Sequence, residues 1–172
     1  MSEYGIDGEL RTDAGYAGES KKNGALTPAA EDYLEMICRL SGVVPEEQGR
    51  GVPALRPVRI GELAEKLRVS PSSASRMAQS MALWGYVDFR RYGYITVTEK
   101  GKERGTYLLR RHAVVREFLE SLTGEDALVE TERIEHHLSE NTVAAMEKRN
   151  KQRAADIKSD EMKGESFRKA EQ

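Results

Sequence analysis

A chain of 172 residues, 33% charged, 38% hydrophobic and poor in aromatic residues, has the composition of a largely helical protein with one domain or two small ones. No apolar run reaches the roughly 18 residues of a membrane span, the first residues do not resemble a signal peptide, and the single Cys38 excludes an internal disulfide or a cysteine-based zinc cluster. The net charge of −2 conceals a basic middle, because residues 59–120 carry 12 Lys and Arg against 7 Asp and Glu, which favours a local contact with a polyanion.

The first helix is expected to begin near Thr27. Residues 1–25 are rich in Gly, Ser, Asp and Lys without apolar periodicity, which predicts a disordered arm. Thr27 suits an N-cap and Pro28 the first helical position, and apolar residues then recur at helical spacing. Gly42 ends the helix, and the Gly and Pro residues within 42–57 predict an exposed loop of unusual length.

A helix-turn-helix with a β-hairpin is expected next. Residues 60–67 have the spacing of a short amphipathic helix, and Ser70 provides the N-cap of a second helix that continues to about Leu83. Two β-like runs, residues 87–89 and 94–98, predict a hairpin with a basic tip that contains glycine. The order of these elements is that of a winged helix-turn-helix.

The second helix of such a unit places its N-terminal half in the major groove of DNA. Hydroxyl groups there can reach phosphates or base edges, Arg can pair with guanine and Gln with adenine, and the hairpin tip can reach the backbone or the minor groove. The candidate DNA-binding residues are Ser70, Ser72, Ser73, Ser75, Arg76, Gln79, Arg90, Arg91 and Tyr92. An ordinary solvated face or a protein–protein contact is the alternative, and the basic middle segment favours DNA.

Three helices are expected after the hairpin. The first runs from Glu99 to Thr123, the second holds the apolar residues between 128 and 138, and Ser139 is a good N-cap for the third. Beyond Asn150 the sequence is polar and charged, which predicts either a fraying helix or a tail.

An acidic and histidine-containing cluster lies in the second of these helices. At helical spacing Glu132, Glu135 and His136 share one face. Two carboxylates and an imidazole suit a divalent cation, and the alternative is a polar helix face with an incidental histidine pair. His137 points away from this face, and Cys38 is expected to be a small core residue.

Five short motifs occur in a fixed order between residues 27 and 150: Glu31–Glu35, Pro71–Ser73, Thr98–Gly101, Arg111–His112 and Ile134–Ser139. Together they resemble the DtxR/MntR family of metal-activated bacterial transcriptional regulators, and more closely its manganese-responsive branch. The resemblance implies two metal ions per chain, bound between the first helix and the helices after the wing. The positions that match the family's ligands are Asp32, Glu35, His112, Glu132, Glu135 and His136.

The resemblance also bears on which metal is bound. The iron-responsive branch has Met at the position of Asp32 and Cys at that of Glu132. Oxygen donors at both positions favour Mn(II) over Fe(II), and Fe(II), Co(II) and Zn(II) are the alternatives.

The expected fold is mostly α-helical. A disordered arm (1–25) precedes a winged helix-turn-helix DNA-binding domain (26–100) with the loop insertion 42–57, an all-helical metal-binding and dimerisation domain (101–150) and a charged helical or disordered tail (151–172). The predicted function is that of a cytoplasmic, homodimeric, Mn(II)-activated repressor of metal-uptake genes that binds a palindromic operator in double-stranded DNA. A metal-independent winged-helix regulator and, less favoured, a binuclear metalloenzyme are the alternatives; no strand-rich enzyme scaffold is evident.

Overall fold

The computed structural model describes residues 26–44, 55–90 and 93–170, with the backbone alone for residues 163–170. The elements of this part of the chain are α1 (Pro28–Ser41), β1 (Val58–Arg59), α2 (Ile60–Leu67), α3 (Pro71–Leu83), β2 (Val87–Arg90), β3 (Tyr94–Val97), α4 (Glu99–Thr123), α5 (Leu128–Ile134), the 3-10 helix η3 (Glu135–His137) and α6 (Glu140–Ala170). The predicted fold class is confirmed. The predicted arm, residues 45–54 of the predicted loop, Arg91 and Tyr92 lie outside the described residues.

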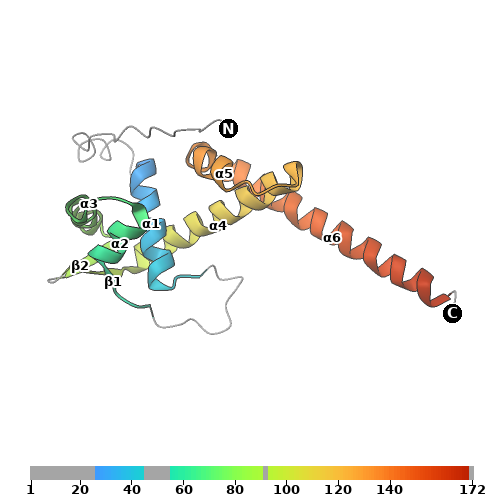
Figure 1. Ribbon diagram of the computed structural model, residues 1–172, viewed down its shortest axis with the longest axis horizontal. Helices are drawn as coiled ribbons and strands as arrows, with labels where there is room; N and C mark the ends of the chain where they lie inside the picture. The colour runs from blue at the N-terminus through green and yellow to red at the C-terminus, as the bar shows by residue number, and fades with distance from the viewer. Residues whose placement is uncertain (1–25, 45–54, 91–92, 171–172) are drawn as a thin grey trace, which may run out of the picture.

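Two parts of the molecule are joined by the long helix α4 (Figure 1). At one end α1, α2, α3 and the sheet form a small body, and at the other end α5 and the start of α6 lie along α4. The remainder of α6 runs out as a single helix away from the rest of the molecule. None of the described helices is long and apolar enough to cross a bilayer.

Helix α1 begins and ends where the sequence predicts. The hydroxyl of Thr27 accepts a hydrogen bond from the backbone N–H of Ala30 at 3.3 Å, and Gly42 closes the helix at φ 90°. Glycine suits this closing position because a side chain is strained in the left-handed region. Leu34 and Ile37 are fully buried on one face of α1 and belong to the main core. Packing of this face against the core therefore fixes the positions of the carboxylates in the first turns of α1, which are those of Glu31, Asp32 and Glu35.

Helices α2 and α3 form the predicted helix-turn-helix. Arg68 closes α2 in the left-handed region at φ 54°, and the Ser70 hydroxyl caps α3 by accepting from the N–H of Ser73 at 3.1 Å. Ala74 and Ala78 of α3 are fully buried. The opposite face of α3, with the predicted DNA-binding side chains, is left toward solvent.

The sheet contains the predicted hairpin and one strand that the sequence did not reveal. The strand order is β1-β3-β2, all antiparallel, with Val87 opposite Val97 in the hairpin. On the other edge of β3, Val58 of β1 pairs with Ile95. A two-residue strand is too short to show alternation, so its existence depends on the tertiary pairing.

Helix α4 approaches the first body closely because two of its residues have no side chain. A Cβ on Gly105 would lie 2.1 Å from the sulfur of Cys38, and a Cβ on Gly101 would lie 1.9 Å from the carbonyl oxygen of Tyr86. Cys38 is fully buried, as predicted. The contact of Gly105 holds α4 against α1, and that of Gly101 holds it against the segment before β2. The first of these contacts helps to set the position of His112 relative to the carboxylates of α1.

The chain changes its helix type after α5. Residues 128–138 were expected to form one α-helix, but α5 ends at Ile134 and η3 follows, with the N–H of Leu138 bonded to the carbonyl of Glu135 at 3.3 Å. Tighter 3-10 turns are common at helix ends, and here Leu138 leaves the helix in an extended conformation. Glu135 and His136 therefore lie on a 3-10 turn instead of on one α-helical face with Glu132.

Helix α6 begins as predicted and continues much further than Asn150. The Ser139 hydroxyl accepts from the N–H of Thr142 at 3.2 Å. The buried Asn150 donates its side-chain N–H to the carbonyl of Val114 in α4 at 3.1 Å. For the residues after Asn150 the sequence predicted either a fraying helix or a tail, and in the structure the helix continues to Ala170.

Candidate metal centre and DNA-binding face

The six side chains predicted as metal ligands come from four elements and meet in one region. They are Asp32 and Glu35 on α1, His112 on α4, Glu132 on α5, and Glu135 and His136 on η3. Nδ1 of His112 lies 3.3 Å from Glu135 Oε1 and 3.9 Å from Glu35 Oε1. The same nitrogen lies 4.0 Å from Glu132 Oε1, whose side chain is half exposed. His112 is thus at the centre of three carboxylates from three different elements.

His136 joins the remaining predicted ligand to this group. Its Nε2 lies 2.9 Å from Oδ1 of Asp32 and 4.0 Å from Oε1 of Glu135. Hydrogen bonds to Asp32 and to Glu31 raise the pKa of His136 to about 10. The imidazole is therefore charged at neutral pH and would have to release a proton to bind a metal.

The residues present fit a divalent cation. Potential ligand atoms of Glu35, His112 and Glu135 all lie within 4.8 Å of one another, and all three residues are buried. Oε2 of Glu135 is buried without a hydrogen-bond partner among the described residues. Burial raises the pKa of Glu35; the charge of Arg39 opposes this shift and that of Glu135 adds to it. Buried carboxylates of this kind are costly unless a positive charge compensates them, and a cation at this position would do so.

Glu31, a fifth carboxylate, is not among the predicted ligands. It lies in the first turn of α1, is buried and forms ion pairs with Arg104 and Arg111 of α4. Its Oε2 also lies 3.0 Å from Nδ1 of His136. Burial would raise the pKa of Glu31, but the hydrogen bond from His136 and the charge of Arg111 outweigh burial and lower it to about 2. The four-residue spacing of Glu31 and Glu35, which puts both on one face of α1, was the available signal.

The predicted DNA-binding residues of α3 lie on its open side. Ser72, Arg76 and Gln79 are exposed, and Ser73 and Ser75 are half-buried. The exposed Ser70 is already engaged, because its hydroxyl caps α3 and contacts the hydroxyls of Ser72 and Ser73.

A basic and aromatic row on the sheet adds a residue that sequence reasoning missed. Arg90, at the end of β2, and Arg59 of β1 both pair with Tyr94 of β3, so the three residues lie side by side. Their face of the sheet is opposite to the one that buries Val58 and Ile95. The guanidinium of Arg59 lies 5.5 Å from the centre of the Tyr94 ring. Recognising Arg59 required knowledge of β1.

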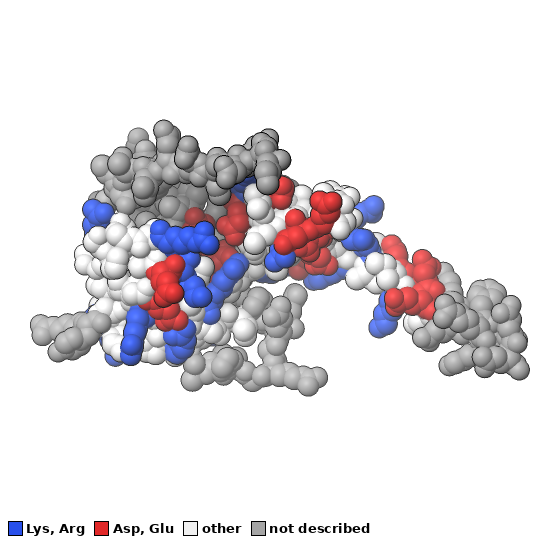
Figure 2. All heavy atoms as spheres, viewed as in Figure 1, with Lys and Arg blue, Asp and Glu red and all other residues white. Residues whose placement is uncertain are grey.

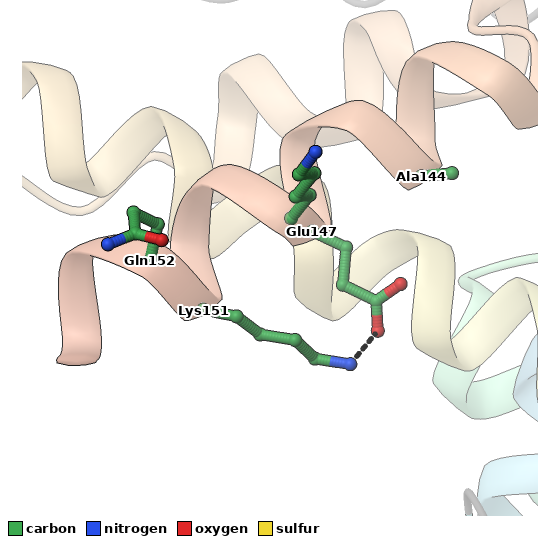
Figure 3. A pocket seen from close by; sticks show the side chains of 5 residues that line it. Ala144, Glu147, Lys151 and Gln152 are labelled. Atoms are coloured by element: carbon green, nitrogen blue, oxygen red, sulfur yellow. Dashed lines mark ion pairs between the residues drawn. The ribbon is translucent and has the colours of Figure 1, made fainter.

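Side chains of both charges occur on each part of the face shown in Figure 2. On the part that holds the helix-turn-helix and the sheet, Lys and Arg surround one group of Asp and Glu, and along α4 to α6 groups of Asp and Glu alternate with Lys and Arg. A hollow on α6 belongs to this second part (Figure 3). It is lined by Ala144, Glu147, Lys148, Lys151 and Gln152. Its one carboxylate, Glu147, pairs with Lys151 at 3.1 Å and with Arg110 of α4, so the hollow is part of the contact between α4 and α6.

Two family models match this chain in consecutive regions. Residues 25–95 match the iron dependent repressor, N-terminal DNA binding domain, and residues 98–162 match the iron dependent repressor, metal binding and dimerisation domain. The chain belongs to the iron-dependent repressor family. It is accordingly a metal-responsive, DNA-binding transcriptional repressor and not an enzyme, which removes the metalloenzyme alternative.

Similar proteins include regulators named for manganese. The HTH-type transcriptional regulator MntR of Oceanobacillus iheyensis is 37% identical over 119 residues, which cover 68% of this chain and 74% of that protein. MntR of Bacillus subtilis is 34% identical over 119 residues, which cover 68% of this chain and 76% of that protein.

Among solved structures, a manganese-dependent transcriptional repressor in complex with manganese is 27% identical with a TM-score of 0.56. The alignment covers 70% of this chain and 52% of that one. The manganese regulator SloR is 27% identical with a TM-score of 0.54, covering 72% and 54%. This chain thus spans about half the length of these solved proteins.

Proposed function

We propose that this protein represses metal-uptake genes in response to Mn(II), and that Asp32, Glu35, His112, Glu132, Glu135 and His136 are its ligands for two ions per chain. The observation that carries the proposal is the convergence of the buried Glu35, His112 and Glu135, whose potential ligand atoms all lie within 4.8 Å of one another. Carboxylate oxygens and imidazole form a donor set that Mn(II) accepts. The names of the similar regulators support the choice of manganese.

The arrangement of the ligands supports a link between metal binding and DNA binding. Asp32 and Glu35 lie on α1, which packs against α2, α3 and the sheet, whereas Glu135 and His136 lie on η3 beyond α4. A bound cation would supply the charge that offsets the repulsion among these carboxylates. The side chains of α1 and η3 could then stay close, and α3 would keep one orientation relative to the dimerisation part. A state that binds the cation more tightly gains population when the cation is present.

We assign residues 26–100 to the DNA-binding domain and residues 101–150 to the metal-binding and dimerisation domain. The open face of α3 and the row of Arg59, Tyr94 and Arg90 would contact the DNA, with Arg91 and Tyr92 at the hairpin tip. Two chains related by a two-fold axis would read a palindromic operator. Exposed apolar side chains at the junction of α4 and α5, Leu122, Leu128 and Val129, favour this junction as the surface where two chains pair.

Retention of operator DNA by the purified full chain, titrated in parallel with Mn(II), Fe(II), Co(II) and Zn(II), tests this function. We expect Mn(II) to promote retention and Glu135→Gln to abolish this response. Retention that is the same with and without every metal would instead favour the metal-independent regulator.

The contact of the sheet with DNA has its own test. Removing one phosphate contact lowers the slope of log affinity against log salt by about 0.9, so Arg59→Ala should weaken binding and reduce the slope by about this amount. Lys158→Ala, which removes one exposed charge from α6, is the matched control. Equal slopes for the two variants would remove Arg59 from the DNA-binding face.

A further inference from the structure

Glu31 interacts with three basic side chains, although it is not among the six predicted ligands. Arg104 donates to its Oε1, Arg111 donates to its Oε2 at 2.9 Å, and Nδ1 of His136 lies 3.0 Å from the same Oε2. It thus connects α1 to α4 and to η3 through one buried group.

The contacts around His136 define which ring nitrogen faces the ligand cluster. A carboxylate only accepts hydrogen bonds, so the hydrogen between Glu31 and His136 belongs to Nδ1 of the imidazole. Nε2, on the other side of the ring, faces Asp32 at 2.9 Å. The imidazole is therefore oriented with one nitrogen held by Glu31 and the other directed at the ligands.

Arg111 makes this arrangement depend on the charge of Glu31. Its Nη2 lies 3.1 Å from Nδ1 of His136, so two donors lie next to each other. They can remain so because Oε2 of Glu31 accepts a hydrogen bond from Nδ1 of His136 and another from Nη1 of the same guanidinium. Without the negative charge, the buried guanidinium would repel the imidazole N–H and displace the ring.

We propose that Glu31 is a positioning residue of the metal centre, and that it holds His136 so that Nε2 can bind the metal while Arg104 and Arg111 hold the Glu31 carboxylate. This inference rests on the proposed function, because it takes His136 to be a ligand. Hydrogen-bonding partners of metal-binding histidines fix the ring orientation, and their loss typically lowers metal affinity by about 10- to 100-fold.

A double-mutant cycle on Mn(II) affinity, measured by calorimetry with the full chain, tests the proposal. Glu31→Gln should weaken Mn(II) binding at least about 10-fold. If Glu31 acts through His136, then Glu31→Gln should cause no further loss when it is added to His136→Ala. Losses that add in the double variant, or a Glu31→Gln variant that binds Mn(II) as tightly as the unaltered protein, would overturn it.

The matched control and a second variant separate positioning from folding. Glu147→Gln removes a carboxylate that also bridges two basic side chains, Arg110 and Lys151, and should leave Mn(II) affinity unchanged. If circular dichroism shows that Glu31→Gln is unfolded, the variant with Glu31→Met and Arg111→Met takes its place, because it removes both charges of the buried pair. It should fold and lose the same affinity; a folded variant with full affinity contradicts the proposal.

A metal-free measurement distinguishes failure of the inference from failure of the proposed function. In the nitrogen NMR spectrum of the unaltered protein without metal, the Nδ1 proton of His136 should exchange slowly, and Glu31→Gln should abolish this protection. Failure of the unaltered protein to bind Mn(II) would refute the proposed function while this signal still reported the Glu31–His136 bond. Absence of a protected Nδ1 proton would overturn the inference itself.

Discussion

Single residues determine how closely α1 and α4 approach each other. The pair of Cys38 and Gly105 leaves no room for an added methyl group. It lies about one helical turn from Glu35 along α1 and about two turns from His112 along α4. The long-range role of Glu31, in contrast, was not visible in the sequence. As a carboxylate in a first helical turn it had a sufficient local explanation, the helix dipole, so nothing pointed to its long-range partners. A local explanation can therefore be correct and still leave the main role of a residue unseen.

The contact between Gly105 and Cys38 predicts the effect of one added carbon. Gly105→Ala should lower the free energy of unfolding by up to about 2 kcal/mol, because an overpacking cost of about 1–3 kcal/mol outweighs the gain of about 1 kcal/mol in helix propensity. Adding Cys38→Ala should restore most of the loss, since it removes the sulfur that the new methyl group would meet. Urea unfolding of the metal-free proteins measures both changes; a stable single variant would mean that α4 can shift at no cost.

The thiol of Cys38 should be inert in the folded protein. Burial, together with the nearby charge of Glu35, raises its pKa to about 12, so the reactive thiolate is nearly absent at neutral pH. Alkylation by iodoacetamide at pH 8 should proceed only when the protein opens, and its rate should rise steeply with urea. Rapid labelling of the native protein would show that α4 separates from α1 far below the unfolding transition.

At the scale of whole elements, the sequence predicted those with local signals. Caps and apolar spacing were sufficient for α1, α2, α3 and α4, whose boundaries agree with the prediction to within a few residues. The elements it missed, β1 and η3, are short and depend on contacts with distant residues. Of the candidate site, the six side chains named from the sequence motifs lie in one region, and their role as ligands stays a prediction. The 3-10 turn that carries Glu135 and His136 was not predicted.

The far half of α6 should be the least stable helix. Residues 151–162 are all exposed, and an isolated helix of this length is marginal in water because tertiary packing supplies most helix stability. In hydrogen exchange, backbone amides after Asn150 should exchange much faster than those of α4 around Leu108, which is fully buried. Equal protection along the whole of α6 would indicate that its outer half is covered in solution.

At the scale of the whole molecule, the candidate metal centre lies where the two parts of the chain meet. Its ligands range from Asp32 to His136 in the sequence, so a cation there closes a long loop and should stabilise the fold. At a free Mn(II) concentration 100-fold above Kd the gain is about 2.7 kcal/mol. This corresponds to a rise in Tm of roughly 5–10 °C for a chain of this size.

Thermal unfolding with Mn(II), with Mg(II) and with a chelator checks this gain. Mg(II) should have little effect, because it favours oxygen ligands in octahedral geometry and the cluster includes two imidazoles. A Tm that does not respond to Mn(II) would mean that no such ion bridges the two parts.

The length of the outer part of α6 converts a small tilt at its base into a large displacement of its end. Twenty residues of helix after Asn150 extend about 30 Å at 1.5 Å per residue. As long as this segment stays helical, a tilt of about 10° at its base would displace its end by roughly 5 Å. A pair of spin labels, one near the end of α6 and one on α3, would therefore report small reorientations of the two parts that are too small to see at the centre itself.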